Sequence, residues 1–341
     1  MSTSGTFDFT VTRDDLVREA MLNIGRLGQT ETPTPQETTD ISRKLNMMVK
    51  QWQGRQDFAP GLKMWTRQRA DLFLSQTVYQ YVLGTTPESA GYGFNPNAAN
   101  WAAGCAALGT NFGQDTLSQT AATGATQLYV NAIGNYTVND WVVIQLDSGD
   151  IYTAQVLTVG SGYIQIYGGS LPSQASSNNY LWNYTTRGQR PLEIVTCVLR
   201  DVNYNDTPLN KMTLETYEIL PNKTSPQYLS DPQAFYYEAQ LNNGQLYLDV
   251  GGAQDVTKHL HVVYLQEIMD FNNPLDNPEY PQEWYMALAW GLTKQIAPMF
   301  NVPFTPDMDK NYMEALAMAR QSNAETTEFY FQVNSANPYS P

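Results

Sequence analysis

Apolar residues recur at helical spacing near both ends of the chain and at alternating, strand-like spacing in between. The longest helical pattern covers residues 280–300. Its stripe, which we expect to face a core, consists of Trp284, Leu288, Leu292, Ile296 and Met299. Pro281 fits the first helical position, and Pro298 lies where a helix can be interrupted.

Three further helices are predicted, and they place helices at both chain ends. Thr12 and Thr34 are N-cap residues in the sequence, and each is followed by acids in the first helical turn. A fourth helix begins near Thr305. We expect these helices to form one bundle with the core residues Leu16, Ile24, Leu45, Trp52, Trp284, Leu288 and Leu292. The opposite face of residues 280–300, with Tyr285, Ala289 and Lys294, is expected to be free for a neighbouring subunit.

The middle of the chain reads as β structure. Residues 63–83 suggest a hairpin, and residues 84–124 read as an irregular excursion rich in Gly, Ala, Asn and Thr. Five short strands follow, at residues 128–131, 141–146, 151–159, 163–167 and 180–184. Turns at residues 147–150 and 160–162 separate three of them, a spacing typical of a small sandwich or barrel inserted into a larger domain.

A second β-rich region follows the insert. Strands are expected at residues 191–201 and 259–267, a short helix at 213–220, and a hairpin of residues 235–240 with 245–250. The predicted fold class is therefore α+β: a helical bundle formed by both chain ends, a β-rich host region, and an inserted small β-sandwich or barrel. The expected parts are 1–62 and 273–322 for the bundle, 63–120 for the hairpin and excursion, 121–186 for the insert, 187–272 for the β-rich region, and 323–341 for an extended arm.

The charge balance argues against binding through phosphate groups. The chain has 19 Lys plus Arg and 33 Asp plus Glu, a net charge of −14. No Lys or Arg lies between Arg69 and Arg187, so this region lacks the side chains that pair with nucleic acid or anionic lipid. No apolar run is long enough for a membrane span, and the first ten residues do not resemble a signal peptide, so a cytosol-like compartment is expected. Cys105 and Cys197 are expected to be reduced and structural.

Two sets of residues could carry chemistry. His259 and His261 alternate on one strand and face the same side, as a metal pair could, but no third ligand is evident, and a solvated strand face is favoured. Asp147 and Asp150 could be paired carboxylates of a glycosidase, with Trp141 and Tyr152 as a sugar platform. Turn formation explains both acids without any substrate and is favoured. No catalytic residue, metal or cofactor is expected, and the chain is predicted not to be an enzyme.

Three stretches, in their order and spacing, resemble one known protein family. The first is residues 24–34 (IGRLGQTETPT), continuing through Glu37 and residues 45–48 to Trp52. The second covers residues 208–217, 235–237 (FYY) and 244–248 (GQLYL). The third is Tyr280-Pro281 with Trp284, Ala287, Leu288 and Leu292. Together they resemble the head-to-tail adaptor of short-tailed bacteriophages, also called tail tubular protein A or packaged-DNA stabilisation protein. The resemblance covers most of the chain outside residues 85–187.

The resemblance implies a structural protein of a phage virion. It implies a homo-oligomeric ring of about twelve copies between portal and tail, assembled in the bacterial host cytoplasm. A portal protein would bind the C-terminal arm with its aromatic residues Phe329, Tyr330, Phe331 and Tyr339, and a tail nozzle protein would attach on the other side. Double-stranded DNA would pass without specific binding, which the acidic composition favours. The alternative is a carbohydrate-binding or glycan-degrading virion protein with its site on the insert.

Overall fold

The computed structural model describes residues 9–54, 65–76, 78–83, 113–167, 169–185, 190–225, 227–241 and 243–322. The chain divides into two compact units, a helical unit (Met1–Trp65 with Ile268–Pro341) and a β unit (Thr66–Glu267). The helices from the two chain ends pack together, and several sheets make up the β unit, so the mixed α+β prediction is confirmed.

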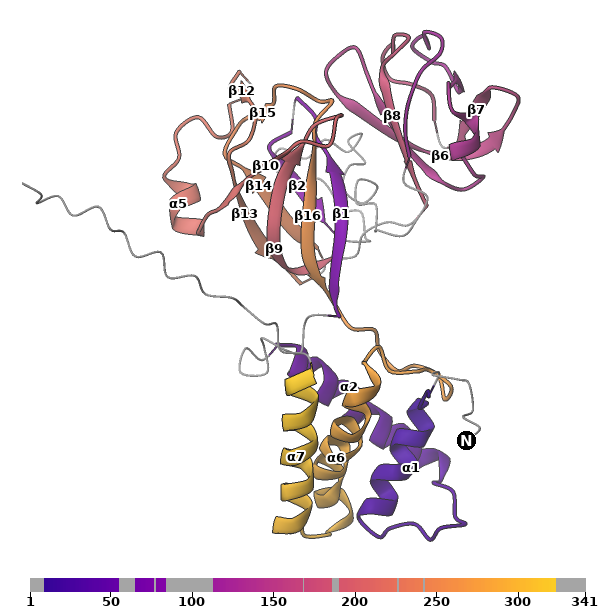
Figure 1. Ribbon diagram of the computed structural model, residues 1–341, viewed down its shortest axis with the longest axis vertical. Helices are drawn as coiled ribbons and strands as arrows, with labels where there is room; N and C mark the ends of the chain where they lie inside the picture. The colour runs from indigo at the N-terminus through magenta and orange to yellow at the C-terminus, as the bar shows by residue number, and fades with distance from the viewer. Residues whose placement is uncertain are drawn as a thin grey trace, which may run out of the picture. The chain divides into compact units, whose positions relative to one another are not determined.

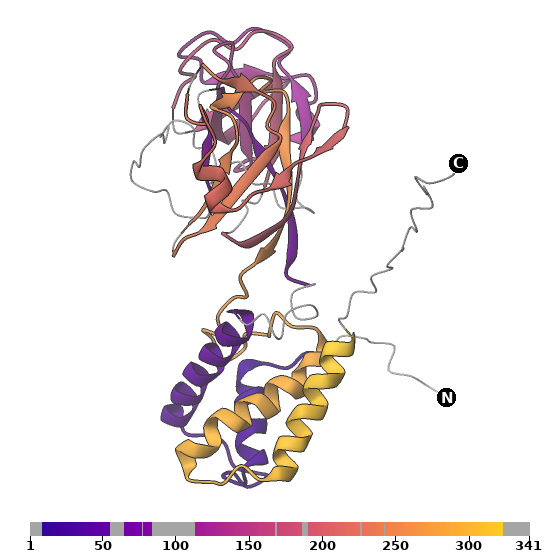
Figure 2. The ribbon, with the colours of Figure 1, turned by 90° about the vertical axis from the view of Figure 1, so that its left-hand side faces the viewer.

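The helical unit is arranged around its third long helix. Helices α1 (Arg13–Asn23), α2 (Pro35–Gly54) and α7 (Pro306–Ser322) each pack against α6 (Tyr285–Ile296), as Figure 2 shows. Short 3-10 turns flank α6, namely η2 (Gln282–Trp284) and η3 (Ala297–Phe300). Two capping boxes begin the first two helices, because Thr12 exchanges hydrogen bonds with Asp15, and Thr34 with Glu37.

Two details of the predicted helix at residues 280–300 are wrong. Pro281 precedes the 3-10 turn η2 and is not the first residue of an α-helix. Met299 is 41% exposed, because the chain leaves the α-helical period after Ile296 and enters η3, which turns this side chain away from the stripe.

Two four-stranded sheets of the β unit share one hydrophobic core. The first has the order β1 (Arg67–Phe73), β16 (His259–Gln266), β9 (Pro191–Arg200) and β10 (Asp206–Pro208). The second has the order β11 (Asn210–Lys211), β13 (Ala234–Ala239), β14 (Gly244–Leu248) and β2 (Gln80–Leu83). Side chains from both sheets form one buried cluster, so we call this pair the host sandwich.

Smaller elements complete this part of the chain. They are helix α5 (Leu214–Glu218), capped by Thr213, and the short parallel pair β12 (Leu229–Ser230) and β15 (Gly252–Ala253). The predicted strands at 191–201 and 259–267, the helix at 213–220 and the hairpin of 235–240 with 245–250 are confirmed.

The hairpin predicted for residues 63–83 is wrong. β1 pairs with β16, while β2 pairs with β14 in the other sheet. β1 (RQRADLF) is mixed in polarity and β2 (QYVL) has only four residues, and neither segment contains information about which distant strand it meets. Pairing across long sequence separations is a property of the tertiary fold.

A six-stranded antiparallel sheet is inserted between β2 and β9 and curls strongly (Figure 1). Its order is β3 (Gly113–Thr116), β8 (Tyr180–Tyr184), β5 (Trp141–Gln145), β6 (Ile151–Val159), β7 (Tyr163–Tyr167) and β4 (Gln127–Tyr129). The five predicted strands of the insert and both predicted turns are confirmed.

The sixth strand, β3, lies where the sequence predicts an irregular excursion. Its residues GQDT have no apolar alternation, and the one buried side chain is that of Asp115. Asp115 accepts hydrogen bonds from the Ala132 amide (2.9 Å) and the Tyr136 hydroxyl (3.3 Å). Because a hydrogen-bonded carboxylate occupies the buried position where a strand usually has an apolar residue, the hydrophobic pattern does not reveal this strand. Residues 84–112 of the predicted excursion lie outside the described residues.

Candidate interaction surface

The seven predicted bundle-core residues all lie in one buried cluster of the helical unit. Trp284 is central to it, because its ring lies 6.3 Å from that of Trp52 and 5.4 Å from that of Trp65. On α6, Gly291 lets Trp52 approach closely: an added Cβ there would lie 2.8 Å from the indole ring. The helices of both chain ends are therefore held together by large aromatic side chains around a small residue.

The outward face predicted for residues 280–300 is only partly correct. Ala289 is buried in the cluster, because α6 is covered by helices on more than one side. Lys294 is exposed, but its ammonium pairs with Asp309 of α7 at 2.6 Å and lies 4.9 Å from the Tyr312 ring centroid. These contacts fix α7 against α6 and leave a different strip of α6 uncovered.

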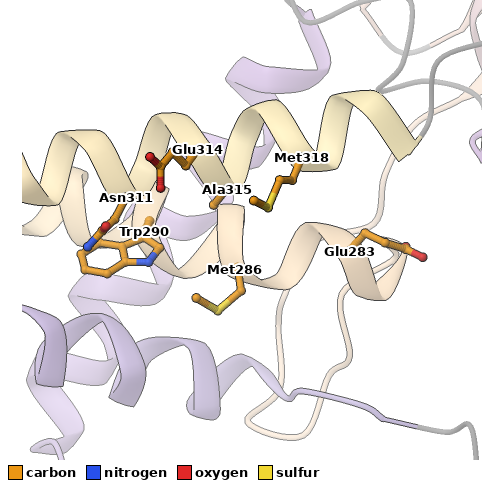
Figure 3. A pocket seen from close by; sticks show the side chains of 7 residues that line it. All are labelled: Glu283, Met286, Trp290, Asn311, Glu314, Ala315 and Met318. Carbon is orange, nitrogen blue, oxygen red and sulfur yellow. The ribbon is translucent and has the colours of Figure 1, made fainter.

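A groove runs along α6 and α7 on this uncovered side (Figure 3). Its volume is about 610 Å³. The groove is lined by Glu283, Met286, Trp290, Asn311, Glu314, Ala315 and Met318. Met286 is 59% exposed and Met318 69% exposed, so flexible apolar side chains face solvent along it. Large apolar residues gathered in one open groove are typical of a contact surface.

The groove arises from the way α7 packs. Tyr312, Leu316 and Ala319 point into the core cluster, so Ala315 and Met318, which lie at other angles around the helix, come out beside α6. Glu283 and Glu314 add carboxylates to the edges of the groove (Figure 3). Glu314 also pairs with Lys310 at 3.8 Å, one turn earlier in α7.

The two histidines lie on β16 and share one carboxylate. His261 Nδ1 is 2.7 Å from Asp71 of β1, and His259 Nε2 is 3.6 Å from the same oxygen. His259 is 1% exposed and packs near the rings of Phe73 and Trp182, so the solvated strand face predicted for it is wrong. Burial lowers the pKa of His259, with the Asp71 charge opposing that shift. Within the described parts of the chain, no group of three or more His, Cys, Asp or Glu side chains is arranged to hold a metal ion.

The carboxylates considered for glycosidase chemistry are bound into turns and contacts. Asp147 accepts hydrogen bonds from the Ser176 amide (2.9 Å) and hydroxyl (2.7 Å), and these bonds lower its pKa to about 2. Asp150 accepts a hydrogen bond from the Ser75 hydroxyl. A general acid needs a raised pKa, so the environment of Asp147 is the opposite of what that role requires.

Other predicted residues are placed as follows. The arm residues Phe329, Tyr330, Phe331 and Tyr339, and Cys105, lie outside the described residues. Cys197 is buried in the core of the host sandwich. In the described part of the chain, no helix combines the length and the hydropathy needed to cross a bilayer.

The methionines of the groove are the functional candidates that sequence reasoning missed. Met286 and Met318 fall outside the apolar stripes of their helices, and that off-stripe position is the signal that could have pointed to them. No protein-family model matches this chain, and no curated protein matches it in sequence.

Proposed function

We propose that this protein is a structural, non-enzymatic subunit of a ring at the head-to-tail interface of a phage virion. In this proposal the ring contains about twelve copies, docks on a portal protein through residues 323–341, connects to a tail nozzle protein and lets DNA pass. The observation that supports it best is the open apolar groove on a helical unit built from both chain ends. The net charge of −14 supports passage of DNA without binding.

The groove fits a second copy of the same chain. Helix α2 carries Met47, 61% exposed, one turn after Arg43. An apolar side chain next to a guanidinium complements an apolar groove edged by Glu283 and Glu314. A contact between two different surfaces of one subunit is heterologous, and its repetition gives a ring when the rotation from copy to copy divides a full turn.

We also infer that the six-stranded insert is a small barrel. An isolated bridge joins Leu117, directly after β3, to Val130, directly after β4. The Ser118 amide donates to the Tyr129 carbonyl (2.9 Å), and the Asn131 amide donates to the Thr116 carbonyl (3.2 Å). These bonds link the two edge strands of the sheet, which is the arrangement that removes free edges.

The ring is tested by native mass spectrometry of the full chain and by electron microscopy of the chain mixed with portal rings of the same virion. We expect a discrete assembly of about twelve copies, seated on the portal. Met318→Asp places a charge in the groove and should abolish this assembly. Met313→Asp is the matched control, since Met313 is also on α7, is 53% exposed and does not line the groove.

Circular dichroism and the melting temperature should show that both variants remain folded. A chain that stays monomeric with and without portal rings would rule out the proposed function. Assembly that tolerates Met318→Asp as well as Met313→Asp would leave the ring in place and exclude the groove as its contact.

A further inference from the structure

An uncharged surface of tyrosines and glutamines covers one outer face of the inserted sheet. It is formed by strands β4, β7 and β6, and we call it the tyrosine platform. The platform consists of Gln127, Tyr129, Thr158, Tyr163, Gln165 and Tyr167. Alternate residues of the same strands, such as Leu128, Ile164 and Ile166, are buried in the core of the insert, so the period of two puts the platform residues on the outside.

The strand register arranges the platform in rows. Tyr129 of β4 lies opposite Tyr163 of β7, with ring centroids 5.9 Å apart. Two residues further along each strand, Gln127 lies opposite Gln165. On the opposite edge of β7, Thr158 of strand β6 is paired with Gln165. Tyr167 is 63% exposed and Tyr129 38% exposed, so rings and amide groups are both presented to solvent.

One ring of the platform is held in place before any ligand arrives. Tyr163 lies so close over Gly160, in the turn between β6 and β7, that a Cβ on Gly160 would be 2.3 Å from the ring. With Tyr129 at its other side, Tyr163 has little freedom left to lose on binding. A preorganised ring lowers the entropic cost of recognition.

The charges around the platform limit what it can bind. Its own residues carry no charge, and residues 116–139 and 151–186 contain no charged residue. The charged residues of the inserted sheet are Asp115 and Asp140, which are buried, and Asp147 and Asp150, which lie at the turn between β5 and β6. The platform has no Lys or Arg that could pair with an anionic polymer. It also has no Asp or Glu that could pair with a cationic ligand.

We propose that the tyrosine platform binds a neutral polysaccharide. Sugar rings present C–H groups that pack on the faces of tyrosine rings, and their hydroxyls exchange hydrogen bonds with amide and hydroxyl side chains such as those of Gln127, Gln165 and Thr158. The centre of a protein contact is normally apolar, whereas amide and hydroxyl side chains alternate with the rings across the platform. This inference does not depend on ring formation.

The test is affinity electrophoresis of the full chain in gels that contain dextran, mannan, xylan or galactomannan, with the anionic polymers alginate and polygalacturonate as controls. We expect at least one neutral polysaccharide, and neither anionic one, to retard the protein. Tyr167→Ala and Tyr129→Ala should each weaken retardation by about tenfold, because each removes a stacking ring. Tyr167→Phe keeps the ring and should retain most of the binding.

Tyr228→Ala, which changes a tyrosine of 46% exposure outside the insert, serves as the control variant and should bind as the unaltered chain does. The inference is overturned if none of the neutral polysaccharides retards the protein, if the anionic polymers do so equally, or if the platform variants bind normally. It is also overturned if the platform variants change the mass of the assembled protein in the absence of any polysaccharide, since the platform would then be a protein contact.

Discussion

At the scale of single residues, His259 is a fully buried side chain of a type that can take up a proton. Its ring packs against Phe73 of the host sandwich and Trp182 of the insert, and Asp71 is an acid beside it. Arg200 and His261 are further groups that disfavour its protonation, while Asp71 and Asp206 favour it. Burial is the largest influence, so the pKa of His259 is lowered from its ordinary value of 6.5.

This lowered pKa predicts loss of stability in mild acid. Below the unfolded pKa the unfolded chain takes up a proton that folded His259 resists, so the free energy of unfolding of the β unit falls as the pH drops from about 7 to about 5. Urea unfolding followed by tryptophan fluorescence across this range measures the slope. His259→Phe keeps an aromatic ring against Phe73 and Trp182 and should flatten the slope. An unchanged slope in this variant would contradict the assignment.

Two carboxylates of the insert, Asp147 and Asp150, have unrelated structural roles. Asp147 and Asp150 are only three positions apart in the sequence, and the structure gives them separate partners in Ser176 and Ser75. Each acid stabilises a local structure, one in the loop that precedes β8 and one between the insert and the host sandwich. Proximity in sequence is therefore no evidence for shared chemistry when turns can use the same residues.

At the scale of elements, the packing of α6 against α2 depends on the absence of a side chain at Gly291. A Cβ at this position would meet Trp52 at 2.8 Å and the Met48 sulfur at 3.0 Å, and both side chains are buried. A glycine within a helix costs about 1 kcal/mol relative to alanine, so its presence here is compensated by the close contact that it permits.

We predict that Gly291→Val destabilises the helical unit by about 2 kcal/mol, because the added atoms overpack a rigid indole. Thermal or urea unfolding monitored by circular dichroism provides the measurement. Ala317→Val, at an exposed position of α7, measures what valine costs in a helix without overpacking and should cost well under half as much. Equal effects of the two substitutions would show that close packing at Gly291 is not important.

At the scale of the whole molecule, the core of the helical unit is separate from those of the β unit. Among the residues that the structure describes, its buried cluster draws on the two chain ends alone, while the host sandwich and the insert have clusters of their own. The β unit starts and ends in one place, because Gln266 donates its amide hydrogen to the Thr66 carbonyl at 2.8 Å. The chain therefore enters and leaves the β unit through adjacent strands.

This arrangement predicts that the helical unit folds without the β unit. A chain in which a short Gly-Ser linker replaces Thr66–Glu267 should keep its helical circular dichroism and unfold in one cooperative transition. It should also keep the groove between α6 and α7. A molten chain without near-ultraviolet tryptophan signal would show that the helical unit needs the β unit to fold.

The sequence alone determined most of the elements of this protein. Caps such as Thr12 and Thr34, the stripe from Trp284 to Ile296, and the alternating strands of the insert act over short distances, so local pattern is enough to find them. The core of the helical unit was also predictable, because the apolar stripe of a helix is normally buried against the apolar stripe of another helix.

The tertiary structure alone decided which distant segments meet. It separated β1 from β2, added β3 to the insert through buried Asp115, and buried His259 instead of leaving it in solvent. It also produced the groove and the tyrosine platform, since each needs side chains from different elements to reach one surface. Strand pairing and helix packing depend on how all the core side chains pack together. The pattern within a single segment therefore does not predict them.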